Sequence, residues 1–98
     1  MYIAIRRYKT DPRHVAQALS QIETAFMPVL KMAPGFVSYY AFQEGPDRLA
    51  TISVFADQES AERSTQSAAN LVKMSLSSLL PDPPEVFHGP VACRSQAG

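Results

Sequence analysis

The sequence contains no tryptophan and one cysteine, and its nine basic residues are matched by nine acidic ones. A single cysteine, Cys93, cannot form an internal disulfide, which fits a reducing cytoplasm and argues against a disulfide-stapled secreted domain. Neither charge forms a run, so we expect no binding to nucleic acid or to anionic membranes. No apolar run approaches the roughly 18 residues of a transmembrane helix, and the N-terminus lacks the charge order of a signal peptide. We therefore expect a cytoplasmic protein.

The length of 98 residues and a hydrophobic fraction of 46% are typical of one compact domain. We assign residues 1–94 to this domain and residues 95–98 to a frayed tail. Residues 2–9 alternate and are rich in aromatic and β-branched side chains, which predicts a strand. Ile3 and Ile5 are expected to face the core, with Tyr2, Ala4, Arg6 and Tyr8 on the other side.

The residues that follow predict a helix, a hairpin, a second helix and a last strand. Apolar residues spaced by three and four predict a helix over residues 13–33, with a kink or break at Pro28. Asp57 is a suitable N-cap for a helix that runs to about Ser78. A rigid Pro-rich linker then leads to a strand over residues 85–94, in which Gly89-Pro90 favours an edge position.

Residues 36–43 and 48–55 predict two strands joined by a turn over residues 44–47, with Gln43 opposite Arg48. One face of this hairpin then carries Val37, Tyr39, Ala41, Ala50, Ile52 and Val54, which we expect the helices to cover. The other face carries Phe36, Ser38, Tyr40, Phe42, Leu49, Thr51, Ser53 and Phe55. A slip of one residue would exchange the faces of one strand.

The resulting order β-α-β-β-α-β predicts a ferredoxin-like α+β fold, a four-stranded antiparallel sheet with two helices on one face. Two helices leave the other sheet face uncovered, and exposed aromatic side chains there exceed the apolar patch that monomers normally present. A second copy of the same face is the simplest cover. We therefore expect a homodimer whose interface contains Phe36, Tyr40, Phe42, Leu49 and Phe55.

Two motifs resemble a known family. Pro34-Gly35-Phe36 opens the second strand, and residues 52–57, Ile-Ser-Val-Phe-Ala-Asp, lead from the third strand into the second helix. With the element order, they resemble the antibiotic biosynthesis monooxygenase-like group of the dimeric α/β-barrel superfamily. The resemblance implies a homodimer with a ligand cavity between sheet and helices. It also implies cofactor-independent oxygenation of polyketide-type aromatic compounds in some members and haem degradation in others.

The sequence departs from the active members of that family. It has no tryptophan, which both enzyme types use, and it carries Asn70 in the second helix where haem-degrading members have an iron-binding histidine. Haem degradation is therefore disfavoured. Two histidines and one cysteine far apart in the sequence match no metal-ligand spacing, so we expect no metal and no cofactor.

The candidate catalytic residues are His88, Arg6 and Tyr40. His88 before Gly89-Pro90 either serves as a general base or makes a structural hydrogen bond. Arg6 either holds a carboxylate or enolate anion or forms an ion pair at a rim. A tyrosine in the cavity would donate a hydrogen bond to a substrate oxygen, but Tyr39 and Tyr40 point to opposite faces, so only one of them lines a given pocket.

Tyr39 and Asn70 are the candidate ligand-binding residues. The sequence thus predicts a homodimer that binds a small aromatic or quinone-like molecule and acts as a cofactor-independent monooxygenase. The alternative is a non-catalytic dimeric binding or stress-response module with an unknown ligand.

Overall fold

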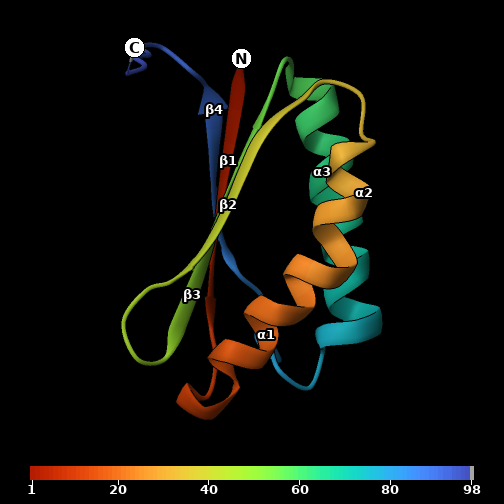
Figure 1. Cartoon of the computed structure of the whole chain (residues 1–98), viewed down its shortest axis with the longest axis vertical. Coiled ribbons are helices and arrows are strands. Elements are labelled where there is room, and N and C mark those ends of the chain that lie inside the picture. Colours follow the sequence, from red (N-terminus) through yellow and green to blue (C-terminus); the bar gives the residue numbers. More distant parts are fainter. Residues whose placement is uncertain (98) are drawn as a thin grey trace.

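The protein folds into a four-stranded antiparallel sheet with its helices packed against one face, as Figure 1 shows for a computed structural model that describes residues 1–97. Spatially the strands follow the order β2-β3-β1-β4, with bounds β1 Tyr2–Lys9, β2 Phe36–Gln43, β3 Arg48–Phe55 and β4 Glu85–Pro90. This arrangement confirms the predicted ferredoxin-like fold. None of the described helices is both long and apolar enough to cross a bilayer. The last residue of the predicted tail, Gly98, lies outside the described residues.

The first helical segment is continuous but changes its pitch. A short 3₁₀ turn at Pro12–His14 leads into α1 (Val15–Gln21), a π-helical turn at Ile22–Phe26, and α2 (Met27–Lys31). Pro28 has no N–H for an α-helical bond, and its ring would collide with the carbonyl four residues earlier. The wider turn before it, closed by the Met27 N–H and the Ile22 carbonyl, accommodates this proline without ending the helix.

The second helical segment consists of α3 (Gln58–Leu71) and a second π-helical turn at Val72–Leu76. Asp57 caps α3 as predicted, because its carboxylate accepts a hydrogen bond of 2.8 Å from the Ser60 N–H. The buried side chains on this segment are mostly small: Ser60, Ala61, Ser64, Ala68 and Leu76.

The prediction that Ile3 and Ile5 face the helices is wrong. Their neighbours on β1 do so instead, and Tyr2, Ala4, Arg6 and Tyr8 are all at most 8% exposed. Alternation defines two faces but does not say which one is covered. Large β1 side chains fit under the helices because the opposing helical residues, such as Ala18 and Ala68, are small.

The predicted hairpin register is also wrong by one residue. Gln43 pairs with Leu49, and the loop closes through a 2.9 Å bond from the Glu44 N–H to the Arg48 carbonyl. With Glu44 opposite Arg48, the turn consists of residues 45–47, three residues in place of the expected four, and Gly45 has φ 70°. Because side chains alternate, this slip moves the whole of β3 to the other face.

Three members of the predicted interface consequently lie under the helices. Leu49 and Phe55 are 0% exposed. Phe36 lies just before a bulge at Val37, which brings it to the same face, and its ring packs edge-on against Phe55. Their assignment to the open face is wrong. Tyr40 and Phe42 do lie on the open face, and both are exposed.

The strand β4 pairs only with β1, which confirms its predicted edge position. It ends at Pro90 rather than Arg94. The bond from the Val91 N–H to the Met1 carbonyl, 2.9 Å long, ties the following residue to the start of β1. Beyond it the chain projects away from the sheet (Figure 1).

Candidate functional site

The centre of the candidate site is the guanidinium group of Arg6. Arg6 lies in the middle of β1, between Thr51 of β3 and Val86 of β4, and its side chain extends under the helices with 2% of its surface exposed. Its Nη2 donates a hydrogen bond of 2.5 Å to Thr65 Oγ1 on α3. Nη1 is buried and has no hydrogen-bond partner among residues 1–97.

No carboxylate within the described chain forms an ion pair with Arg6. The ion pairs found there involve the more exposed arginines Arg7, Arg13, Arg48 and Arg63. Burial lowers the pKa of Arg6, while the nearby Tyr8 and Tyr39 act in the opposite direction. A buried cation without a counter-ion is costly, since water that stabilised its charge has been removed. The site therefore favours an anionic or strongly accepting oxygen.

Two tyrosines accompany Arg6 on the covered face. Burial raises the pKa of Tyr8, and it raises that of Tyr39 to about 12. Both hydroxyls are therefore protonated at neutral pH and can donate hydrogen bonds. Phe26 packs edge-on against Tyr39, with ring centroids 5.6 Å apart, and limits the movement of that ring.

A cavity of about 370 Å³ opens beside Arg6, between α3, β4 and the linker that joins them. Its walls are mainly apolar, while Lys73 and Asp82 are charged exposed residues. A void of about 20 Å³ next to it is also lined by Arg6, Tyr8 and Tyr39, and this is room for about one water molecule. The apolar walls of the cavity are formed by Ala69, Val72, Leu80, Pro81, Pro83, Pro84 and Val86.

Local sequence explains this wall. The second helical segment ends in the π turn at Val72–Leu76, and Val72, the first residue of this turn, lines the cavity. The residues of the linker, Pro81 to Pro84, have few backbone conformations because three of the four are prolines. The wall opposite Arg6 is therefore stiff.

His88 occupies a neighbouring opening rather than this cavity. The Tyr2 hydroxyl and His88 Nδ1 are 2.6 Å apart, and both residues line a separate opening of about 190 Å³. Thr65 and Val86 line both spaces and so stand between them. His88 thus makes the structural hydrogen bond that was the alternative to a catalytic role.

The other predicted site residues are dispersed. Tyr39 lies on the covered face beside the Arg6 site, whereas Tyr40 is 59% exposed on the open face and cannot reach it. Asn70 is exposed on α3 and does not line the cavity. Sequence reasoning missed Tyr8 and Thr65, although the alternation of β1 placed Tyr8 on the same face as Arg6.

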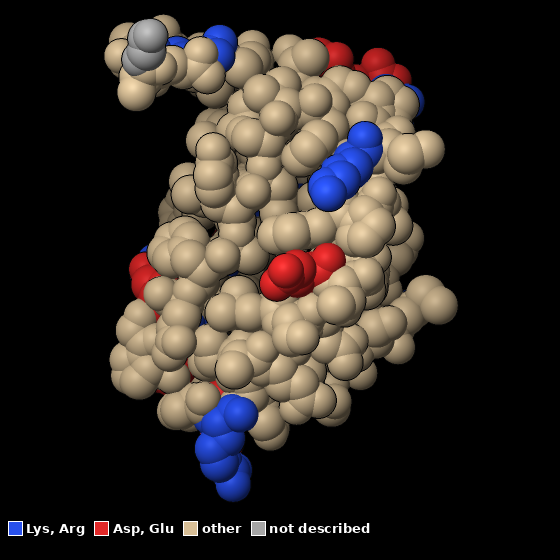
Figure 2. All heavy atoms as spheres, in the orientation of Figure 1, with Lys and Arg blue, Asp and Glu red and all other residues tan. Residues whose placement is uncertain are grey.

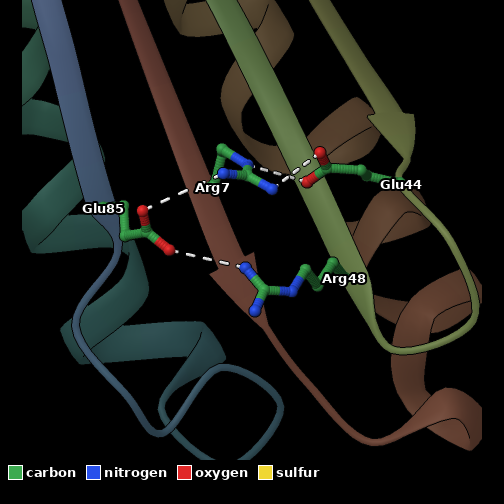
Figure 3. Close-up of polar contacts among 4 residues, drawn as sticks. All are labelled: Arg7, Glu44, Arg48 and Glu85. Carbon is green, nitrogen blue, oxygen red and sulfur yellow. Dashed lines mark hydrogen bonds and ion pairs between the residues drawn. The ribbon is translucent and has the colours of Figure 1, made fainter.

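The open face of the sheet has an apolar centre and a charged end. Figure 3 shows Arg7 between Glu44 and Glu85, with Arg48 also directed to Glu85. The Arg7–Glu44 pair is bidentate, with two hydrogen bonds of 2.9 Å. The rest of the face carries Ile3, Ile5, Val37, Tyr40, Phe42, Ile52, Val54 and Phe87.

Charge is sparse elsewhere. On the face shown in Figure 2, Lys, Arg, Asp and Glu side chains are few and lie far apart, except at the upper edge, where acidic side chains lie together beside a basic one. Within the described part of the chain, no three His, Cys, Asp or Glu side chains gather as a metal site would require.

Known proteins resemble this chain in sequence and in structure. A model of the family described as antibiotic biosynthesis monooxygenase matches residues 1–71. No curated protein gave a significant match. A similar crystal structure is that of a monooxygenase from the gene ActVA-Orf6 of Streptomyces coelicolor, in complex with nanaomycin D. It has a TM-score of 0.78 and 16% identity, covering 98% of this chain and 92% of that one.

Two further crystal structures come from proteins without a stated activity. NE2512 from Nitrosomonas europaea, a protein of unknown function, has a TM-score of 0.76 and 23% identity over 99% of this chain and 95% of that one. A conserved protein from Methanosarcina mazei Go1 has a TM-score of 0.72 and 18% identity over 90% and 89% of the two chains. At such identities the likeness shows a shared fold.

Proposed function

Because the chain belongs to the antibiotic biosynthesis monooxygenase family, we propose that it binds a small aromatic or quinone-like molecule beside Arg6 and oxygenates it without a cofactor. The observation that carries this proposal is the buried guanidinium at the wall of a largely apolar cavity, whose Nη1 has no acceptor among the described residues. Apolar walls suit an aromatic ring, and the guanidinium suits an oxygen that carries negative charge. The unpaired Cys93 supports a cytoplasmic location.

The chemistry follows from stabilising an anion. A phenol or an activated CH group that gives its proton to solvent water at the cavity becomes electron-rich enough to react with O₂. Arg6 would favour that anion, and the protonated Tyr8, which also lines the cavity, would donate a hydrogen bond to its oxygen. Tyr39 lines only the adjoining void and would act through a water molecule there. For a CH₂ group the balanced reaction consumes one O₂, converts CH₂ to C=O and releases one water.

One observation favours a second function, non-catalytic binding of the same ligand. Among the described residues that line the Arg6 cavity there is no histidine, cysteine or glutamate, and Asp82 is exposed. The imidazole of His88 is held by Tyr2 in the adjacent opening. On this proposal the cavity stores or senses the anion, and proton removal takes place in solution.

Oxygen uptake with anthrone- and hydroquinone-type compounds tests the first function. We expect uptake above the rate without protein, and its loss in Arg6→Met. Arg7→Met is the matched control, because the neighbouring Arg7 points to the opposite face. Binding of these compounds without uptake would support the second function, and the absence of Arg6-dependent binding would refute both.

We also propose that the protein is a homodimer formed through the open face. Val37, Tyr40, Phe42 and Phe87 are 44–59% exposed there, and each aromatic residue can bury 150–250 Å². Such a patch is larger than soluble monomers usually leave in water. A second copy offers the same apolar centre, as a twofold interface requires.

A further inference from the structure

A second cavity lies between α2 and α3. Its volume is about 220 Å³, which is the share of about seven water molecules in the liquid. One wall is apolar and consists of Phe26, Val29, Leu30, Ala33 and Pro34. The facing wall belongs to α3 and presents the hydroxyl-bearing side chains of Ser60, Ser64 and Ser67.

Ser64 is the unusual member of this wall. Its residue is 5% exposed, and its Oγ is buried without a hydrogen-bond partner in the part of the chain that the structure describes. Ser67, one turn further along α3, donates its hydroxyl to the Arg63 carbonyl at 3.1 Å. A buried hydroxyl normally finds a partner, since it has lost its hydrogen bonds to water. Ser64 therefore has an unused donor and acceptor at the cavity.

The charges at this cavity point to an uncharged ligand. Arg63 is its one charged lining residue among those described, and the Arg63 Nη2 lies 3.9 Å from Glu59 Oε1. The positive charge thus has a carboxylate partner one turn earlier on the same helix. Within the described lining, no unmatched charge favours an anion, in contrast to the Arg6 cavity.

We propose that the α2–α3 cavity is a second binding site, for a small neutral molecule with an apolar body and one hydroxyl or carbonyl oxygen. The body packs against Val29, Leu30 and Ala33, and the oxygen pairs with the Ser64 hydroxyl. A molecule of the size of phenol fits the volume. Phe26 lines both this cavity and the small void beside Arg6.

The test compares phenol with toluene, which has the same shape but no hydroxyl. Each probe is titrated into the full-length protein and followed by the NMR signals of Leu30 and Ala33, which line the α2–α3 cavity and not the Arg6 cavity. We expect both probes to shift these signals. Ser64→Ala should weaken phenol about 3- to 10-fold, the loss of one hydrogen bond, and leave toluene unchanged.

Ser67→Ala is the matched control, because the Ser67 hydroxyl is already bonded within α3. This variant should leave the ratio of the phenol and toluene dissociation constants as in the wild type. Ser64→Ala should fold, since alanine favours helix and removes an unpaired oxygen. The proposal is overturned if that ratio is the same in Ser64→Ala and wild type. It is equally overturned if the probes shift only Val86 and Leu80 at the Arg6 cavity.

Discussion

Replacing Arg6 with methionine should make the protein more stable and abolish binding in its cavity. Arg6 is 2% exposed, and its guanidinium forms no ion pair with any described carboxylate, so folding removes a charge from water without a counter-ion. Methionine keeps most of the apolar stem and fills the same space flexibly. The substitution therefore removes the cost of the charge and keeps most of the packing.

The size of the effect follows from the two groups that lose a contact. Arg6 donates to Thr65 Oγ1, but this hydroxyl also donates to the Ala61 carbonyl at 3.1 Å, so Thr65 is not left unpaired. The lost hydrogen bond costs about 1 kcal/mol, whereas replacing buried charged groups with apolar ones stabilises proteins by about 1–4 kcal/mol. We expect a net gain of up to about 3 kcal/mol, or up to about 24 °C in Tm for a domain of this size.

Thermal unfolding followed by circular dichroism at fixed protein concentration measures this gain. Arg7→Met is the control, because it breaks the bidentate pair with Glu44 on the open face; it should leave Tm unchanged or slightly lower. A large fall in Tm for Arg6→Met would refute the reasoning. It would mean that the guanidinium holds the fold together and is not held ready for a ligand.

Three further outcomes are expected. Gly35→Ala should lower the free energy of unfolding, measured in urea, by about 1–2 kcal/mol more than Gly45→Ala. Both glycines have positive φ, but only at Gly35 would an added Cβ meet a neighbour, Ser60 Oγ at 2.6 Å. Equal losses would contradict this. Asp57→Ala should lower the urea midpoint by removing the cap of α3. Because the hydrogen bond from the Ser60 N–H lowers the pKa of Asp57, the cap is fully effective above the unfolded pKa, about 3.9. The stabilisation by the cap is lost as pH falls through the folded pKa. A difference in urea midpoint between Asp57→Ala and the wild type that persists in strong acid would be evidence against this explanation. Ile52→Arg at the centre of the open face should change the mass in light scattering from twice 10.8 kDa to 10.8 kDa, and a monomeric wild type would refute the dimer.

The elements of the fold could be read from local sequence, because each has its own signal. Asp57 marks the start of α3, and Gly89-Pro90 marks β4 as an edge strand. The faces could not be read in the same way. A hairpin turn of three residues and one of four differ little in local energy. The choice between them nevertheless decides which face of the sheet each side chain of β3 occupies.

The candidate site depended on the same choice of face. The sequence predicts Arg6 as a candidate for holding an anion, but it also favours Ile3 and Ile5 as the core-facing residues of the same strand, since isoleucine is the more hydrophobic. Arg6 is buried because the small residues of α3 leave room for its long stem. That complementarity joins segments far apart in the sequence, and no local pattern reports it.

The π turn at Ile22–Phe26 makes one stretch of the first helical segment tolerant of a change in length. A π turn uses one residue more than an α turn, so α2 has the phase that it would have if the segment were regular and one residue shorter. Loss of an exposed residue such as Thr24 would therefore leave Leu30 directed to the core and Val29 and Met32 exposed. Loss of a residue from α1, where the turns are regular, would instead rotate α2 by about 100° about the helix axis and carry Leu30 out of the core.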